Sequence, residues 1–150
     1  MTTIPFKDAT PVLQVKNLNF TFAGLPVSVL DGISLTVRAG ETLALVGESG
    51  CGKSITSLAL MGLLPASAQI VSGEMQFRRH DLRKLSPRDY ADLRGSELAM
   101  IFQEPMTSLN PAFTLGDQLS AAAMRHQTVS RADATKLALQ ILDKVQIPSA

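Results

Sequence analysis

The sequence predicts an α/β fold, and three observations support this class. Before residue 38, apolar and polar residues alternate as they do in half-buried antiparallel strands. Residues 98–102 form a continuous apolar run, which is typical of a strand buried on both faces. After residue 114 the apolar residues recur at the spacing of an α-helix. Strands followed by helices in this order indicate an α/β arrangement with a later helical section.

The N-terminal part is expected to form a small antiparallel sheet. Residues 12–22 predict one long strand, and a turn signal follows at residues 23–26. Residues 27–30 and 33–37 predict two further strands. The apolar run 42–46 is then expected to be the strand that leads into a glycine-rich loop.

Helices and strands alternate after this loop. A helix-like run spans residues 55–64, and residues 72–77 predict another strand. Ser86 and Pro87 are typical of an N-cap and a first helical residue, and the helix that they start is expected to end near Gly95.

Two helices are predicted in the C-terminal part. The first spans residues 115–126 and is expected to be capped by Thr114. Ser130 begins the second, with Asp133 three residues later in a loose version of the capping box. Its apolar positions follow helical spacing: Ala134, Leu137, Ala138, Ile141, Leu142 and Val145.

The glycine-rich loop indicates the chemistry of the chain. Its eight residues read G-x-x-x-x-G-K-S: Gly47, Glu48, Ser49, Gly50, Cys51, Gly52, Lys53 and Ser54. Glycines let the backbone wrap closely around an anion, so that successive N–H groups point inward at a phosphate. The predicted helix after the loop adds the free N–H groups and the dipole of its N-terminus. A loop between a strand and a helix is the context that the phosphate-binding loop of nucleotide triphosphatases requires.

Two side chains of the loop have expected roles toward a bound triphosphate. Lys53 would reach the β- and γ-phosphates as a mobile point charge, and Ser54 would offer its hydroxyl to Mg²⁺. The alternative interpretation is a glycine-rich turn with a surface lysine. Cys51 is the only cysteine, so it has no partner for a disulfide or a metal site, and its small size suits the loop.

The composition argues against several other classes of protein. A net charge of +1 gives no case for bulk nucleic-acid binding. The cationic residues near position 80 are interpreted as a solvated surface. No apolar stretch approaches the ~20 residues that span a bilayer, and residues 1–10 lack the apolar segment of a signal peptide. Any membrane association is therefore expected to come through a partner.

Three strings of the sequence carry a resemblance to a known family. Residues 47–54, residues 59–64 (A-L-M-G-L-L) and residues 100–111 (M-I-F-Q-E-P-M-T-S-L-N-P) resemble ATP-binding cassette (ABC) transporter ATPases, and the third string is similar to the dipeptide and oligopeptide importer group. The resemblance covers nearly the whole chain. It implies a P-loop NTPase (RecA-like) core with an N-terminal antiparallel β-subdomain over about residues 11–103. It further implies the start of a helical subdomain over about residues 104–150, in a domain that is incomplete at its C-terminus.

The resemblance implies roles for two residues outside the loop. Gln103 matches the glutamine of the family's Q-loop, which would contact Mg²⁺ and the attacking water; the alternative is a glutamine that caps a turn at a strand end. Phe22 matches the aromatic residue that stacks on adenine, although many family members carry Tyr there. Phe20 lies two positions earlier on the same face of a regular strand, and core packing is the alternative for either phenylalanine.

The resemblance also implies a function and partners. It implies an ATP-binding subunit, with ATP and Mg²⁺ as cofactors, that energises import of peptides or a related small solute. Two ATPase subunits, as a homodimer or a heterodimer, would sandwich ATP and act on transmembrane permease subunits, and indirectly on a substrate-binding protein. Such a subunit would lie peripherally at the cytoplasmic face of the inner membrane. Residues 104–113 would lie near the groove that receives a permease helix.

Several family motifs are not found within these 150 residues. There is no LSGGQ-type signature, no Walker B carboxylate pair after Gln103 and no later switch histidine. Phosphoryl transfer depends on such positioning and charge-stabilising groups, so this chain alone is not expected to hydrolyse ATP efficiently or to fold well. Two alternatives therefore stand beside the transporter subunit: a module that binds ATP without hydrolysing it, and a soluble ABC ATPase with no membrane partner.

Overall fold

The structure is a computed structural model, and it describes residues 10–24, 28–104 and 108–147. The chain divides into two compact units, Met1–Ala91 and Asp92–Ala150. The first unit holds the sheet and the glycine-rich loop, and the second holds the two C-terminal helices.

The first unit is built on an antiparallel sheet, as the sequence predicts. Its strands lie in the order β2-β1-β3-β4 and all neighbours are antiparallel. Their bounds are β1 Pro11–Phe22, β2 Leu30–Arg38, β3 Ala68–Phe77 and β4 His80–Asp81. The predicted strand 33–37 lies within β2, which already includes Leu30, whereas Val27 lies outside the described residues. Strand β3 begins at Ala68, four residues before the predicted start at Ser72.

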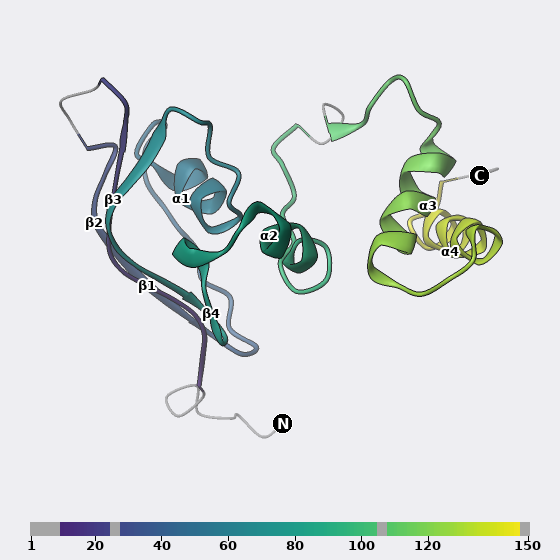
Figure 1. Ribbon diagram of the computed structural model, residues 1–150, viewed down its shortest axis with the longest axis horizontal. Helices are drawn as coiled ribbons and strands as arrows, with labels where there is room; N and C mark the ends of the chain where they lie inside the picture. The colour runs from purple at the N-terminus through teal and green to yellow at the C-terminus, as the bar shows by residue number, and fades with distance from the viewer. Residues whose placement is uncertain (1–9, 25–27, 105–107, 148–150) are drawn as a thin grey trace. The chain divides into compact units, whose positions relative to one another are not determined.

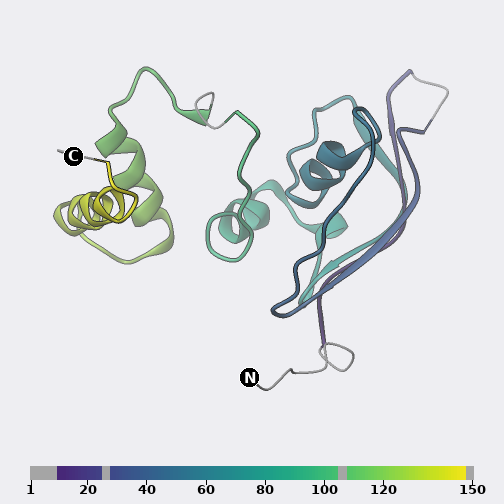
Figure 2. The same ribbon diagram turned by 180° about the vertical axis from the view of Figure 1, so that it is seen from behind.

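Apolar side chains of the central strands form the core of this unit. Val15, Leu18 and Phe20 of β1 are almost fully buried, together with Met75 of β3. Helix α1 (Lys53–Leu60) lies on the concave side of the curved sheet (Figures 1 and 2) and buries Thr56 and Ala59. The sequence pattern correctly predicts a helix here, although it predicts one that runs on to residue 64.

Helix α1 ends early because the chain needs a left-handed residue just after it. Gly62 has φ +62°, and a Cβ at this position would lie 2.7 Å from the Tyr90 ring. The Tyr90 hydroxyl donates to the backbone oxygen of Leu82 at 2.9 Å, inside the unit. Gly62 therefore both stops the helix and lets the tyrosine pack closely.

A polar side chain ties the three long strands together where β1 is irregular. The Asn19 amide nitrogen donates to the Asn17 oxygen at 2.9 Å and to the Ser72 hydroxyl at 3.0 Å. Its amide oxygen accepts from the Gly32 N–H at 3.0 Å. The register of β1 shifts on either side of this point, and Asn17 has φ +46°. Bulges of this kind increase the bend of a sheet, which here curves around α1.

The predicted start of the helix near residue 87 is confirmed. Helix α2 (Pro87–Leu93) follows the short helix η2 (Leu82–Lys84). The Ser86 hydroxyl accepts from the Asp89 N–H at 3.2 Å, and the Asp89 carboxylate accepts from the Ser86 hydroxyl and backbone N–H. These hydrogen bonds lower the pKa of Asp89 below its ordinary value. Gly95, with φ +87°, follows the helix where the sequence expects its end.

Two predicted strands are not formed, and this is the main correction to the sequence analysis. Residues 42–46 and 98–102 belong to no strand, apart from one isolated parallel bridge between Arg94 and Leu98. Val46 is 93% exposed and Ile101 is 92% exposed. An apolar strand is stable only when neighbouring strands bond its backbone and cover its side chains. The four-stranded sheet of the described residues offers neither segment such a neighbour.

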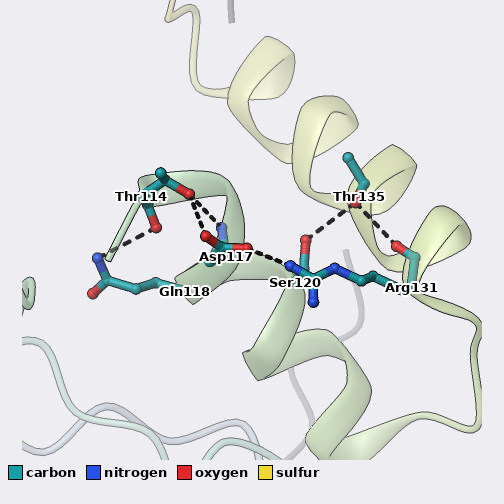
Figure 3. A network of polar contacts seen from close by, with 6 residues as sticks. All are labelled: Thr114, Asp117, Gln118, Ser120, Arg131 and Thr135. Carbon is teal, nitrogen blue, oxygen red and sulfur yellow. Dashed lines mark hydrogen bonds and ion pairs between the residues drawn. The ribbon is translucent and has the colours of Figure 1, made fainter. Parts of the chain in front are cut away.

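The second unit contains a helical hairpin that matches the prediction closely. It is formed by α3 (Leu115–His126) and α4 (Arg131–Lys144). Thr114 and Ser130 are their N-caps, and each hydroxyl accepts from a backbone N–H three residues later. The pair is joined by the Asp117–Arg131 ion pair and a contact between the Ser120 and Thr135 hydroxyls (Figure 3). Among the described residues, no helix is long and apolar enough to cross a membrane.

The exposed apolar segments lead to a prediction for the isolated chain of 150 residues. We expect a broad thermal transition, with an enthalpy well below the ~0.7 kcal/mol per residue of a compact domain, and strong binding of an apolar dye. Differential scanning calorimetry and dye fluorescence measure these two properties. The double variant Val46→Thr and Ile101→Thr should bind less dye at an unchanged midpoint, because both side chains already lie in water. A single sharp transition with a full enthalpy would contradict this account.

Candidate functional site

The glycine-rich loop connects the exposed segment 42–46 to helix α1. A turn is closed by the Cys51 N–H, which donates to the Glu48 oxygen at 3.3 Å. Gly50 has φ +83° and Gly52 has φ +94°, a region that residues with a side chain rarely adopt. Gly52 is also the N-cap of α1 and provides no side chain to cap it. The first N–H groups of the helix are therefore left for another acceptor, as the sequence analysis expects.

The base of the loop is fixed to the sheet by close packing at Gly52. A Cβ on this residue would lie 2.4 Å from the Leu30 Cδ2 and 3.6 Å from the Val29 oxygen. Leu30 is buried and pairs with Phe20 in the central strand. The Thr56 hydroxyl donates to the Gly52 oxygen at 2.9 Å from the next turn of α1. The loop therefore starts its helix from a defined point on the sheet.

The Lys53 ammonium closes the loop on itself. It donates to the Gly47 oxygen at 2.7 Å and to the Glu48 oxygen at 2.6 Å. A longer contact, 3.3 Å, joins it to the Cys51 sulfur. The cationic head group thus lies inside the curve of the loop, bonded to the same turn whose N–H groups would bind a phosphate. A bound phosphate would offer stronger, charge-assisted partners than these neutral carbonyls.

The Ser54 residue is exposed at the first turn of α1, beside Lys53. The exposed Ser54 hydroxyl at the start of α1 could contact a ligand that binds at the loop. Glu48 and Ser49 are exposed at the tip of the loop. In the described ranges no group of three or more His, Cys, Asp or Glu side chains could hold a metal ion. A metal at this site would therefore need most of its ligands from the bound phosphate groups and water.

The two candidate phenylalanines differ in exposure. Phe20 is 0% exposed and belongs to the core, whereas Phe22 is half-buried at the end of β1. Their rings meet edge to face, with centroids 5.0 Å apart. Phe20 pairs with Leu30, which packs against Gly52, so the end of β1 is linked to the base of the loop. Of the two rings, only that of Phe22 has surface left for a ligand.

Gln103 is exposed and lies in the second unit, whereas the loop and Phe22 lie in the first. The string that follows it includes residues 105–107, which lie outside the described residues. The structure thus links the loop to the end of β1 through Leu30 and Phe20. Gln103 lies in the other unit and is described only there. The two contacts that the sequence analysis missed are Gly52 on Leu30 and Lys53 on the loop carbonyls. The sequence offers one indication of the contact between Gly52 and Leu30, which is the glycine at the start of a predicted helix.

The packing at Gly52 leads to a prediction that separates backbone strain from a steric clash. Gly52→Ala should cost about 2–5 kcal/mol of stability, because a left-handed alanine costs about 1–2 kcal/mol and the displaced Leu30 adds about 1–3 kcal/mol. Gly40→Ala is the matched control, since Gly40 has φ +75° and open space where its Cβ would lie. Gly40→Ala should show only the cost of placing alanine in a left-handed conformation. Denaturant titrations of both variants measure the difference, and equal destabilisation would show that the Leu30 contact is unimportant.

Comparisons with known proteins show the family to which the chain belongs. The family model described as ABC transporter matches residues 30–149. The chain is 48% identical over 140 residues to the dipeptide transport ATP-binding protein DppD of Bacillus subtilis, which covers 91% of this chain and 42% of that protein. It is 42% identical over 137 residues to the oligopeptide transport ATP-binding protein AppD of the same organism, with 89% and 42% covered.

A third relative is named for a different solute. The chain is 44% identical over 151 residues to the glutathione import ATP-binding protein GsiA of Escherichia coli, with 95% of this chain and 24% of that protein covered. The chain thus spans about two fifths of the length of the first two relatives and about a quarter of the third. Because the family model covers most of the chain and includes the loop, this α/β chain with its P-loop belongs to the ABC transporter family.

Proposed function

We propose that this chain is part of an ATP-binding subunit that energises ABC-type import of peptides or a related small solute. The names of its relatives, which refer to dipeptide, oligopeptide and glutathione transport, support the class of solute. The observation that carries the proposal is the loop itself. It combines an uncapped helix start at Gly52, left-handed glycines and a lysine head group inside the curve.

Binding of ATP is proposed to replace hydrogen bonds that Lys53 makes within the loop by hydrogen bonds to phosphate. In the structure, Lys53 is bonded to the oxygens of Gly47 and Glu48. A phosphate that enters the loop would accept from Lys53 and from the free N–H groups at the start of α1. The ammonium then moves from neutral acceptors to anionic ones, which are about twice as strong. The loop keeps its shape because Gly52 stays packed against the sheet.

The residues present fit Mg²⁺ as a companion of ATP. Ser54 offers one exposed hydroxyl next to the phosphate site, and Mg²⁺ commonly takes one or two protein ligands plus phosphate oxygens and waters. When bound, the ion would neutralise charge on the phosphates. Gln103 is proposed as a second ligand on the basis of the family resemblance. Its neutral amide can accept from water and coordinate through its oxygen.

Phe22 is proposed as the platform for adenine. Its ring is half-buried at the strand end that is linked through Phe20 and Leu30 to the base of the loop. The Phe20 ring contacts it from the core in an edge-to-face arrangement. A base stacked on an aromatic ring gains dispersion contact at a small cost in side-chain entropy.

Hydrolysis and transport are proposed for the longer protein to which such a chain would belong. Its partners would be a second ATPase subunit and membrane permease subunits, at the cytoplasmic face of the membrane. Gln103 would sense the attacking water and move with the permease. The second ATPase subunit would cover the bound ATP from its other side. This closure of the two subunits would drive the movement of the permease subunits.

The first prediction from this proposal concerns Lys53. Lys53→Ala should weaken ATP binding by at least tenfold, because a charge-assisted contact worth about 1.5–3 kcal/mol is lost. Lys136→Ala removes an exposed lysine of α4 and is the matched control, which should bind as the unmodified protein does. Isothermal titration with ATP and Mg²⁺ measures both. Equal affinities in the two variants would overturn the proposed site, and ATP binding without turnover in the full-length protein would favour a non-hydrolysing module.

The second prediction separates the adenine contact from the phosphate contact. Phe22→Ala should weaken ATP binding by about 1–3 kcal/mol, which is the usual worth of a stacked base. Binding of inorganic triphosphate should be unchanged, and Phe22→Tyr should restore ATP binding. If Phe22→Ala weakens both ligands equally, the ring only packs the core.

A further inference from the structure

The side chain of Gln118 is bonded to the loop that precedes its own helix. Its amide oxygen accepts from the Asn110 N–H at 2.9 Å, and its amide nitrogen donates to the Asn110 oxygen at 3.1 Å. The same nitrogen lies 3.1 Å from the Phe113 oxygen. It also lies 3.5 Å from the Thr114 oxygen (Figure 3). Gln118 therefore engages both backbone groups of Asn110, as a neighbouring strand would.

The loop 110–114 has little else to hold its shape. Its residues are all exposed, so burial of apolar surface contributes little. Inside the loop the Ala112 N–H donates to the Asn110 side chain at 3.0 Å, and the Phe113 N–H donates to the Asn110 oxygen at 3.2 Å. All of these bonds meet at Asn110, which Gln118 anchors to α3.

The fixed end of this arrangement is the hairpin of α3 and α4. Thr114 and Asp117 form the cap of α3, and Asp117 pairs with Arg131 at the start of α4 (Figure 3). The position of Gln118 is thus defined by two helices. Loop 110–114 is held to the hairpin at two points, by the Gln118 amide at Asn110 and by the cap at Thr114.

The loop displays an apolar side chain beside a hollow. Phe113 is 61% exposed and lines a cavity of about 460 Å³ together with Ala121 and Met124. The two charged residues at this cavity, Asp117 and Arg131, neutralise each other. A hollow of this kind suits an apolar side chain from a partner rather than a charged group.

We propose that Gln118 is a positioning residue, which holds loop 110–114 in the shape that meets an apolar side chain of the membrane subunit. The partner rests on the proposed function above, whereas the role of the amide rests on the contacts of Gln118. A neutral amide is required, because its oxygen must accept from one backbone N–H while its nitrogen donates to backbone carbonyls. A carboxylate can only accept, and it would face the carbonyl oxygens without a proton.

This requirement gives a test based on protonation. Gln118→Glu keeps the size of the side chain, and a protonated glutamic acid can again donate to a carbonyl. The nearby carbonyls disfavour its charged form, so its pKa should lie above the ordinary value of about 4.3. In the full-length subunit assembled with its membrane subunits, permease-stimulated ATP hydrolysis by Gln118→Glu should fall about tenfold at about pH 7.5. Relative to the unmodified complex, it should regain part of this loss at about pH 5.5, where a larger share of the new carboxyl groups is protonated.

The controls separate this inference from the proposed function. Gln140→Glu places the same charge on an exposed position of α4 and should match the unmodified complex at both pH values. Gln118→Leu cannot titrate and should be defective at both. ATP affinity should be unchanged in all three variants, because none touches the phosphate loop. If the unmodified subunit fails to bind ATP, the proposed function fails. If it binds ATP and Gln118→Glu keeps full stimulation, the inference is overturned.

A second readout covers the case in which the variants assemble poorly. Amide hydrogen exchange at Asn110 in the full-length subunit reports the bond to Gln118 without any partner. Exchange should be about tenfold faster in Gln118→Leu and unchanged in Gln140→Glu. Equal exchange rates at Asn110 in all proteins would show that Gln118 does not hold the loop, and would overturn the inference.

Discussion

The contact between Gly52 and Leu30 is the constraint on which the proposed phosphate site depends. It requires a residue with no side chain in a left-handed conformation, at the point where the loop becomes a helix. Leu30 belongs to the buried core and pairs with Phe20 in the central strand. The free N–H groups of α1 and the end of β1 are therefore placed from the same point on the sheet. A shift of that point would move both the phosphate contacts and the proposed adenine platform.

The Lys53 contacts give the glycine-rich loop a defined shape. The ammonium is not loose in solvent but bonded to two carbonyls of the loop. Such bonds hold the loop in a compact turn, and the proposal is that phosphate contacts replace them. Gln118 acts in a similar way in the second unit, where its hydrogen bonds to Asn110 help to order an exposed loop. In both places a long polar side chain holds a glycine-rich or exposed segment by bonding its backbone.

The sequence predicts the features that depend on neighbouring residues. The predicted N-caps Ser86, Thr114 and Ser130 are confirmed. Each cap is a hydrogen bond to a residue three positions later, so the local sequence is enough to predict it. The prediction of strand β1 is correct because a half-buried strand shows an alternation of apolar and polar residues that can be recognised locally. The segments 42–46 and 98–102 fail because a strand with apolar side chains still needs partner strands, which an apolar run does not specify. The contact of Gly52 with Leu30 joins residues 22 positions apart in different elements, so no local pattern could predict it.

The exchange of hydrogen bonds at Lys53 is the central claim, and a structure of the full-length protein with a non-hydrolysable ATP analogue and Mg²⁺ tests it most directly. The account predicts that the Lys53 Nζ lies within hydrogen-bond distance of phosphate oxygens and has given up at least one of its bonds to the Gly47 and Glu48 oxygens. It also predicts that Gly52 remains packed on Leu30. Phosphates bound elsewhere, with Lys53 still bonded to both carbonyls, would contradict it.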